Sequence, residues 1–486
     1  MEIRRKRNRA KIFFGGLLIF VVVFGGAFFG IQFITKTGIF RVPGVVYYDE
    51  SLKPAELAKL QTIFTGEIDL DKDVKISAKE YTTRPELGEG EFLYDIYVPV
   101  SDFYEEKMDT SELAGGEYHT IPIEELDFTQ KLLAVDGDYY LDDYNSGATF
   151  RVLSFESEKY NEEILPLVAE SFTKEFPEKD NTLSLVQTGV TALSRGMNAK
   201  LNTVDDATYF AEKIKDYLSK FDLTHTSNES SFTNLATSEN ICSDVRFINT
   251  LTTIGVDIVE LTGNHNQDCG NEAARETIDI YEQKNIKTVG GGRNAEEAAV
   301  PLEIAEKGND ITFLAYNEST GGATYGNTPG ANQYYEESAA AEIAAAKARG
   351  NLVLVDVQYY ECSNYDTSYE NTACDYADSA AGDQVGFFRH LIDLGADIVV
   401  GTSAHQPQTF ELYNDGVIYY GLGNLFFDQI WWPGTTRSLM LEHYFYNDKL
   451  LQTRITPTVY DDSMQTGLMD KETSEWFIRR LVQARP

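Results

Sequence analysis

The stretch VDIVELTGNHNQDCG, Val256 to Gly270, joins a short apolar run to a polar loop that ends in glycine. The apolar run has the length and composition of a buried β-strand. An amphipathic run, residues 271–284, follows the loop directly and predicts a helix. A strand, a polar loop and a helix in this order predict one βα unit of a mostly parallel sheet.

The same alternation recurs along the chain from Leu183 onward. The expected strands are SLVQTGVTAL (184–193), LTHTS (223–227), VDIVEL (256–261), DITFLAY (310–316), NLVLVDVQ (351–358) and ADIVVGT (396–402). The expected helices are DATYFAEKIKDYLSKF (206–221), NEAARETIDIYEQK (271–284), EESAAAEIAAAKA (336–348) and GDQVGFFRHLIDLG (382–395). The last third of the chain is rich in β-formers. Together these patterns predict an α/β layered sandwich completed by antiparallel strands.

Polar segments follow most of the expected strands. In open α/β sheets, ligands bind outside the carboxyl ends of the strands. The segments at those ends are TGVTALSRG (188–196), TSNESSF (226–232), TGNHNQDCG (262–270), DVQYYEC (356–362), GTSAHQPQ (401–408) and YGLGNLFFDQ (420–429). We therefore expect one polar site built from several strand ends, with His265 and His405 in it.

Taken in order, these segments resemble the CapA-type capsule or poly-γ-glutamate synthesis family, a relative of the calcineurin-like metallophosphoesterases. The resemblance runs from Leu183 to Tyr460. Its most specific parts are LTGNHNQDCG (261–270), VGGGRNAEEA (289–298), LIDLGADIVVGTSAHQPQ (391–408) and IYYGLGNLFFDQ (418–429). It implies a layered sandwich of the metallophosphoesterase type over residues 183–460.

The resemblance also implies the residues of a site. In phosphoesterase relatives, asparagine, histidine and aspartate hold two divalent cations that activate water for displacement at phosphorus. The matching metal positions are Asn264, His265, Asp268 and His405. The catalytic candidates are His265, His405, Glu229 and Glu361. The substrate-binding candidates are Arg195, Asn228, Asn424 and Asp428.

Three positions depart from the family pattern. Val190 stands where the family commonly has the aspartate of T-G-D, Gln358 stands at the histidine of H-W-G, and Thr402 stands at the histidine of G-H. These side chains bind metal poorly or not at all. We therefore expect one divalent ion or none. Two interpretations stay open: a hydrolase or transferase that uses a mononuclear metal or a metal-free acid/base pair, and a non-catalytic assembly or binding protein.

The N-terminus predicts a membrane anchor. Residues 1–11 are strongly basic, and residues 12–34 contain no charged side chain. A helix of this length spans roughly 34 Å, enough to cross the bilayer core. We expect a cytoplasmic tail, a single transmembrane helix at 12–35 and an extracytoplasmic remainder. A cleaved signal peptide is the alternative, which the length of the run disfavours. Gly26 and Gly30 would allow a homodimer through this helix.

Charge and composition divide the rest of the chain. Residues 43–182 mix short strands and helices and predict a small α/β domain of unknown role, before the domain at 183–460 and a helical tail at 461–486. The formal net charge of −36 disfavours nucleic acid as a partner. The resemblance to the CapA-type family implies a cell-envelope polymer or its precursor as the partner, and the N-terminal anchor predicts the cell membrane as the location.

Four cysteines fall in the part expected outside the membrane, where disulfides form. Cys362 with Cys374, across a short polar loop, is the expected pair, although the spacing leaves the other pairings open. Zinc ligation is the alternative, but the sequence contains no C-x2-C pair.

The remaining features have open interpretations. His119, His225, His390 and His443 are expected to be structural or surface residues, with His225 as a second candidate for the cleft. Arg195 is either an anion clamp or the partner of an acid. Trp431 and Trp432 form either a stacking patch for a sugar or polymer or a loop packed on the domain.

Overall fold

The computed structural model describes residues 2–4, 45–65, 73–113, 116–156, 168, 170–172, 174–318, 321–359 and 383–486. The chain divides into two compact units, which are Met1–Val100 with Asp109–Glu125 and Leu132–Glu178, and Ser101–Met108 with Leu126–Lys131 and Lys179–Pro486. The predicted anchor at 12–35 and the pair of glycines in it lie outside the described residues. Among the residues that are described, no helix has both the length and the apolar composition to cross a bilayer.

The first unit contains one sheet with the strand order β1-β2-β3-β7-β4-β5. Its core lies between the sheet and α1, because alternate residues of β3, Val74 and Ile76, are buried with Leu60 and Phe64 of the helix. The elements up to β7 are β1 Glu2–Arg4, β2 Val45–Tyr48, α1 Pro54–Thr65, β3 Val74–Tyr81, β4 Glu91–Asp102, η1 Thr110–Glu112, β5 His119–Pro122, η2 Ile123–Glu125, β6 Gln130–Leu132, α2 Tyr140–Asp143 and β7 Thr149–Glu156.

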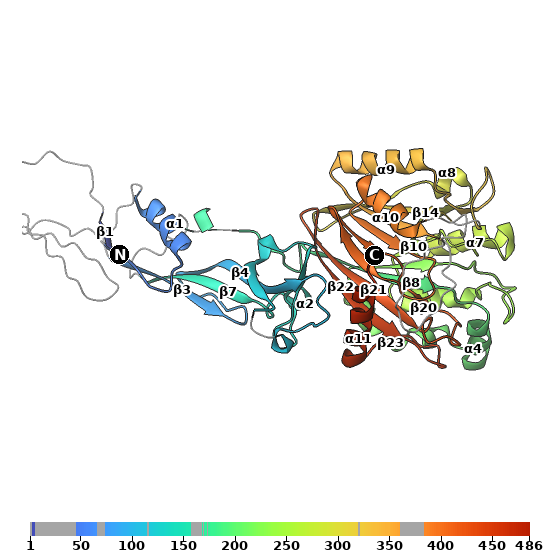
Figure 1. Cartoon of the computed structure of the whole chain (residues 1–486), viewed down its shortest axis with the longest axis horizontal. Helices are drawn as coiled ribbons and strands as arrows, with labels where there is room; N and C mark the ends of the chain where they lie inside the picture. The colour runs from blue at the N-terminus through green and yellow to red at the C-terminus, as the bar shows by residue number, and fades with distance from the viewer. Residues whose placement is uncertain are drawn as a thin grey trace, which may run out of the picture. The chain divides into compact units, whose positions relative to one another are not determined.

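The second unit contains an eight-stranded sheet and a six-stranded sheet (Figure 1), besides the two-stranded sheet of β12 and β15. In the first, β11-β10-β9-β8 are parallel, β21 and β22 continue antiparallel, β23 ends the sheet, and β20 pairs with β8. In the second, β14-β16-β17-β19 are parallel between the antiparallel edge strands β13 and β18. The prediction of a mixed α/β fold is confirmed.

The elements of the second unit follow in chain order. They are β8 Leu183–Thr191, α4 Gly196–Val204, η3 Ala207–Ala211, α5 Lys215–Leu218, β9 Leu223–Asn228, η4 Val245–Phe247, α6 Ile248–Thr253, β10 Ile258–Glu260, α7 Gly270–Gln283, β11 Lys287–Val289, β12 Gly291–Gly292, α8 Ala295–Ala298, β13 Leu302–Glu306, β14 Asn309–Asn317, β15 Gly330–Ala331, α9 Glu336–Arg349, β16 Leu352–Gln358, α10 Gln384–Asp393, β17 Ile398–Gly401, β18 Phe410–Tyr413, β19 Gly416–Tyr419, β20 Asn424–Phe426, β21 Arg437–Tyr446, β22 Lys449–Val459, β23 Gly467–Leu468 and α11 Lys471–Gln483.

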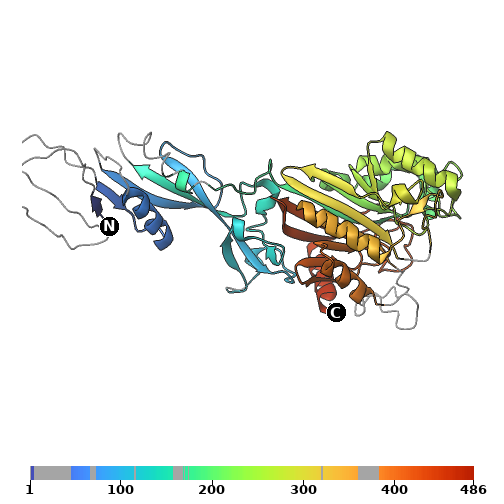
Figure 2. The same cartoon turned by 90° about the horizontal axis from the view of Figure 1, so that it is seen from above.

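Helices cover the outer faces of both sheets, and apolar side chains fill the space between the sheets. Leu185 and Ile258 of the first sheet pack in one core with Phe313 and Leu354 of the second. On the outer face of the second sheet, α9 and α10 pack against β16 and β17, and Figure 2 shows α9 lying along that face. The helices α4, α6 and α7 pack on the first sheet. The result is a four-layer α/β/β/α arrangement.

One expected helix, at 206–221, is wrong in extent. The segment forms the 3-10 helix η3 and the single-turn helix α5. Asp206 caps η3 by accepting from the backbone N–H of Thr208, and aromatic and aliphatic side chains such as Phe210 and Leu218 are fully buried. Packing of these side chains in the core therefore decides the local backbone over helical propensity.

Candidate functional site

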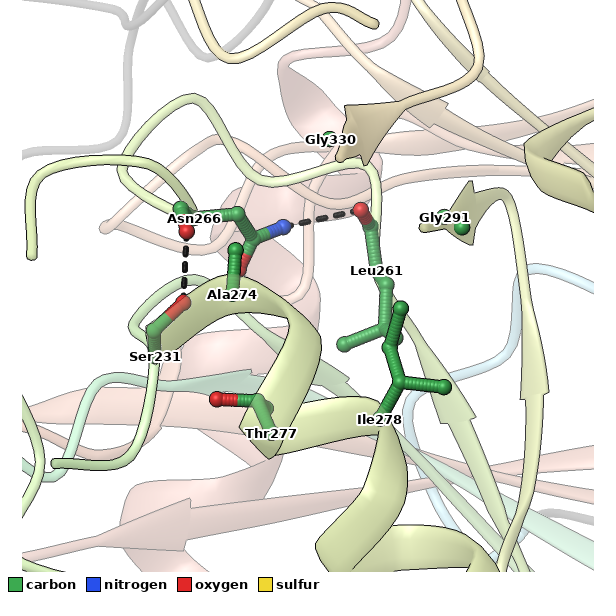
Figure 3. Close-up of a pocket in the computed structure, with 9 residues that line it drawn as sticks. Ser231, Leu261, Asn266, Ala274, Thr277, Ile278, Gly291 and Gly330 are labelled. Carbon is green, nitrogen blue, oxygen red and sulfur yellow. Dashed lines mark hydrogen bonds between the residues drawn. The ribbon is translucent and has the colours of Figure 1, made fainter. Parts of the chain in front are cut away.

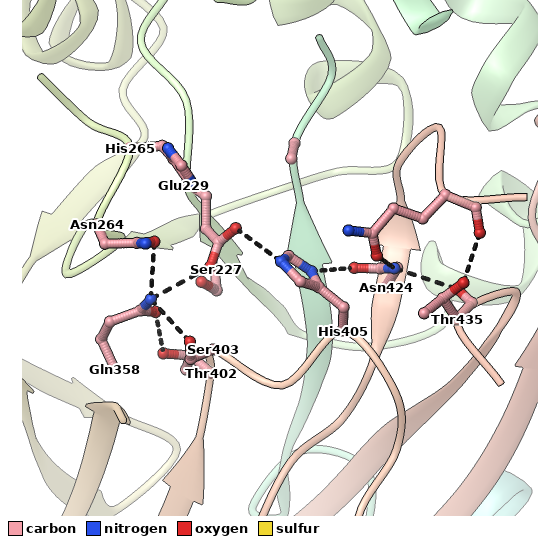
Figure 4. Close-up of polar contacts among 12 residues, drawn as sticks. Ser227, Glu229, Asn264, His265, Gln358, Thr402, Ser403, His405, Asn424 and Thr435 are labelled. Atoms are coloured by element: carbon pink, nitrogen blue, oxygen red, sulfur yellow. Dashed lines mark hydrogen bonds and ion pairs between the residues drawn. The ribbon is translucent and has the colours of Figure 1, made fainter. Parts of the chain in front are cut away.

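Five predicted site residues come together where the strands of the two sheets end. Figure 4 shows Glu229 after β9, Asn264 and His265 after β10, His405 after β17 and Asn424 at the start of β20. The side chains of Glu229, His405 and Asn424 are buried in unit two. The two sheets face each other, so strand ends far apart in sequence meet at one polar cluster, here called the strand-end cluster.

Gln358, the last residue of β16, connects this cluster across the sheets. Its Nε2 lies 3.1 Å from Asn264 Oδ1, 3.0 Å from Ser403 Oγ and 3.4 Å from Glu229 Oε1. Thr402 donates from Oγ1 to Gln358 Oε1 at 3.4 Å. An amide with two N–H hydrogens therefore lies among three oxygens, two of which belong to predicted ligand or catalytic residues (Figure 4).

His405 is held in a defined orientation. Its Nδ1 lies 2.8 Å from Asn424 Oδ1, while Asn424 Nδ2 donates to Gln429 Oε1 and to the carbonyl of Thr435. Because the asparagine amide is used as a donor elsewhere, its oxygen accepts from His405, so Nδ1 carries the proton. The opposite nitrogen, Nε2, lies 3.7 Å from Glu229 Oε2. The ring also packs on Phe427, with centroids 5.2 Å apart.

Close backbone packing places Glu229. The loop after β10 passes so near that a Cβ added at Gly263 would lie 2.6 Å from Glu229 Cα. Only glycine fits this approach. The glycine that precedes Asn264 in the sequence therefore brings the loops of β9 and β10 together.

His265 and Asp268 form a local pair in the loop before α7. His265 Nδ1 lies 2.8 Å from Asp268 Oδ2, and the two side chains are 26% and 41% exposed. Both are more exposed than His405 and Glu229.

The predicted substrate-binding residues Arg195 and Asp428 bind each other. Arg195 Nη2 lies 2.6 Å from Asp428 Oδ1, and the backbone N–H of Gly196 donates to Asp428 Oδ2 at 3.0 Å. The guanidinium also lies 4.5 Å from the centroid of Phe427, the ring that packs on His405. Of the two interpretations of Arg195, the structure shows the pairing with an acid. Asn228 donates to the carbonyl of Ser230, and Glu361 lies outside the described residues.

The donor set does not fit two metal ions. Val190, where the resemblance places a bridging carboxylate, is buried in an apolar group with Ala192 and Phe427. The amide donor of Gln358 points its hydrogens at the oxygens that would bind a cation. Among the described residues, no three His, Cys, Asp or Glu side chains lie close enough together to hold a metal ion.

A second polar group, here called the inter-sheet cluster, lies on the same strands and was not predicted as a unit. His225 Nε2 of β9 lies 3.0 Å from Asp356 Oδ2 of β16, and Gln187 donates to the same carboxylate. Glu260, which accepts from Thr262, is also fully buried. Burial, and then the negative charge of Asp356, raises the pKa of Glu260 to about 7. His225 is thus a core residue.

A disulfide joins two loops of the site. Cys242, after the Glu229 segment, bonds to Cys269, the residue that follows Asp268 and caps α7. The sequence did not decide between this pairing and the others. Because both thiols are in the disulfide, these two cysteines are excluded as zinc ligands. The expected pair Cys362 and Cys374 lies outside the described residues.

A small cavity beside the loop of β10 does not extend the site. Figure 3 shows it between that loop and α7, where Asn266 donates to the carbonyl of Leu261 and accepts from Ser231. Its volume is about 20 Å³. A single water fills such a space, so it excludes a polymer unit.

The fold and the site define an α/β/β/α protein with a polar site at its strand ends. Residues 184–429 match the family of the bacterial capsule synthesis protein PGA_cap, and the chain belongs to this family. The inferred resemblance to CapA-type proteins is therefore confirmed.

Similar proteins include two named for capsule or PGA biosynthesis. The capsule biosynthesis protein CapA of Bacillus anthracis is 25% identical over 223 residues, which cover 45% of this chain and 52% of that protein. The PGA biosynthesis protein CapA of Bacillus subtilis (strain 168) is 28% identical over 204 residues, 41% of this chain and 50% of that protein. The chain thus spans about half the length of these relatives.

Solved structures give a weaker likeness. The NAD nucleotidase (NadN) of Haemophilus influenzae aligns with a TM-score of 0.32 and 11% identity, over 62% of this chain and 55% of that one. The protein TT1561 of Thermus thermophilus aligns with a TM-score of 0.31 and 8% identity, over 55% of this chain and 99% of that one. These values carry no conclusion about the site.

Proposed function

We propose that the chain is a membrane-anchored, extracytoplasmic protein that acts in the synthesis of a capsule, poly-γ-glutamate or another cell-envelope polymer. Its strand-end cluster acts as a hydrolase- or transferase-like site. Family membership and the names of the relatives support the polymer role. The arrangement of Asn424, His405 and Glu229 carries the proposal of a reactive site.

In this site His405 is the general base and acid. Asn424 fixes the tautomer with the proton on Nδ1, so the lone pair of Nε2 faces Glu229. His405 accepts a proton from the attacking water or hydroxyl, Glu229 stabilises the imidazolium that forms, and the same nitrogen then returns the proton to the leaving group. Burial of both side chains strengthens this charge interaction.

The site binds at most one divalent ion. Glu229 Oε2 and His405 Nε2, which face each other, would hold it, and in that state His405 would be a ligand of the ion rather than the base. Such an ion would polarise the bond under attack. A histidine must be neutral to bind metal, so bound ion is expected to leave as the pH falls through the imidazole range near 6.5.

Two observations support the extracytoplasmic location. The basic run before residues 12–34 predicts this orientation. The Cys242–Cys269 disulfide is typical of an oxidising compartment. Protease added outside intact cells should digest the chain after Lys36, with a cytoplasmic protein as the control. Protection of that region would overturn the orientation.

The reactive site is tested in cells that lack the chain and are complemented with variants. His405→Ala and Glu229→Gln should each abolish surface polymer while protein level stays that of the wild type, because the first removes the group that transfers the proton and the second removes the charge that stabilises the imidazolium. His390→Ala, an exposed histidine paired with Glu336 on α9, is the matched control and should leave polymer unchanged. Normal polymer with both site variants would contradict the reactive site.

A non-catalytic assembly role is the second candidate, and the contacts of Gln358 favour it. An amide that donates to Asn264, Ser403 and Glu229 stabilises the site without a cation. Under either role, Val190→Asp combined with Thr402→His should raise bound metal toward two ions per chain, measured by mass spectrometry of the metals. Two tightly bound ions in the wild type would contradict the structure of this site.

A further inference from the structure

Two tryptophans stand exposed on the loop that follows β20. Trp431 is 63% exposed and Trp432 is 45% exposed, and their ring centroids lie 6.1 Å apart at an interplanar angle of 78°. Tryptophan is a large apolar side chain, so its exposure on a folded surface is costly and typical of a binding surface.

The loop is rigid. Thr435, which is fully buried, donates from Oγ1 to the carbonyls of Gln429 and Trp432, and its own carbonyl accepts from Tyr460. At the start of the loop, Asp428 is held by Arg195 and the N–H of Gly196. The exposure of the two indoles therefore belongs to a fixed backbone, which lowers the entropy cost of binding.

The loop is also connected to the strand-end cluster. Asn424, which orients His405, donates to the carbonyl of Thr435, and Thr435 donates to Trp432. Three hydrogen bonds thus link the imidazole to the backbone of the tryptophan pair. The tryptophan pair therefore lies close to the strand-end cluster.

Charge selects the kind of ligand. The loop at 428–437 carries one acid and one base, Asp428 and Arg437. Arg195 is paired with Asp428, and the Arg437 guanidinium lies 5.2 Å from the ring of Trp476. The whole chain has a formal net charge of −36. The loop has no cluster of unpaired cations to bind a polyanion, and the net charge of the whole chain repels one at long range, whereas an uncharged ring with an apolar face gains contact with the indoles.

We infer that Trp431 and Trp432 form a stacking subsite for uncharged sugar rings of a glycan strand, beside the strand-end cluster. This inference rests on the proposed role in envelope-polymer synthesis and names one substrate class for it. The apolar C–H face of a pyranose ring stacks on an indole. Because the two indoles lie at 78° to each other with centroids 6.1 Å apart, they present two differently oriented faces to neighbouring rings of one chain.

The test is a fluorescence titration of the full chain in vesicles of phosphatidylethanolamine and phosphatidylglycerol. The chain has three tryptophans, so Trp476→Phe leaves only the two loop indoles as reporters. A hexasaccharide of N-acetylglucosamine should give a saturable spectral shift. In this background Trp431→Ala and Trp432→Ala should each weaken binding at least about tenfold. The exposed Leu235→Ala is the matched control and should leave affinity unchanged.

Three results would overturn the inference: no saturable shift with the hexasaccharide, unchanged affinity in both alanine variants, or quenching of the loop indoles by brominated lipid, which would place them in the bilayer. His405→Ala separates the two proposals. Hexasaccharide binding should persist in this variant, while the surface polymer of complemented cells is lost. If His405→Ala binds the hexasaccharide and complemented cells still make normal surface polymer, the proposed reactive site alone is contradicted. If His405→Ala abolishes surface polymer but the hexasaccharide does not bind, the subsite alone is contradicted.

Discussion

The inter-sheet cluster and the strand-end cluster lie on the same strands but differ in chemistry. On β16, Asp356 belongs to the first and Gln358 to the second; on β9, His225 belongs to the first. The inter-sheet cluster keeps ionisable groups in full burial and pairs them with each other. The strand-end cluster has the amide of Gln358 and the hydroxyl of Thr402 where the resemblance places histidine ligands, and Val190, where it places a carboxylate, lies in an apolar group. The comparison teaches that charge is retained where the sheets meet and reduced where a ligand would enter.

Removing Asp356 should have the largest effect. Asp356→Ala leaves His225 and the amide of Gln187 buried without their acceptor, so we expect a loss of about 3–5 kcal/mol in the free energy of unfolding. Urea denaturation followed by tryptophan fluorescence measures it, because all three tryptophans lie in the second unit. Asp310→Ala, an exposed aspartate on the neighbouring strand β14, is the control. Equal losses in both variants would mean that the cluster is not structural.

Glu260 should make stability depend on pH. Its pKa is about 7 in the folded chain and near 4.5 ordinarily, so the folded state binds the proton more tightly. Its contribution to stability is full below pH 4.5 and is lost as the pH rises through 7, on the order of 3 kcal/mol. Asp356 is the charged group that faces it, with His225 beyond. As the pH rises from about 5 to about 8, Glu260→Gln should therefore gain stability relative to the wild type, by up to about 3 kcal/mol in the free energy of unfolding.

His443 acts in the opposite direction. Burial, with a smaller effect of the charge of His225, lowers the pKa of His443 from 6.5 to about 3. The contribution of His443 to the stability of the folded chain is therefore present above pH 6.5 and is lost as the pH falls through 3. The wild-type curve sums both groups, which is why the difference between wild type and Glu260→Gln is the quantity to measure. A difference that stays constant across the range would show that Glu260 has no raised pKa.

The strand-end cluster should respond less to substitution. Gln358→Leu removes the donor to Glu229, Asn264 and Ser403, and we expect a loss of about 1–3 kcal/mol in the free energy of unfolding. Gln333→Leu, which removes one hydrogen bond to the carbonyl of Asn317, is the matched control and should cost less. If Gln358→Leu is as stable as the wild type, the amide does not stabilise the strand-end cluster. The stated difference between the two clusters would then be wrong for the strand-end cluster.

The sequence predicted the strand ends that carry the cluster, because apolar runs and the loops after them are local signals. The segments at those ends contain Glu229, Asn264, His405 and Asn424, and the resemblance to the CapA-type family assigned these four residues to the site. Gln358 was recorded as a departure from the family pattern, but its contacts were not predicted. They depend on β9 and β16 facing each other across two sheets, and one sequence does not show which strands face. The inter-sheet pair His225 and Asp356 was missed for the same reason.

The sequence also left the pairing of cysteines open, although the Cys242–Cys269 bond has a clear position in the fold. Cys242 and Cys269 are 27 residues apart in sequence, with β10 between them. Their Cα atoms come within 5.9 Å only after the loops of β9 and β10 are packed together. Loop packing of this kind, set by Gly263 against Glu229, gives no periodic signal.

The Cys242–Cys269 bond has a consequence for how the chain is made. A chain retained in a reducing cytosol would keep two thiols there, and the segment that carries His265 would be joined to its neighbour by packing alone. Oxidation supplies the covalent link, and the proposed export would bring the chain to a compartment where this oxidation occurs. Preparations from cells that lack an oxidising route would therefore mix linked and unlinked molecules, and the share of linked molecules becomes a property to check before any activity of this protein is compared between laboratories.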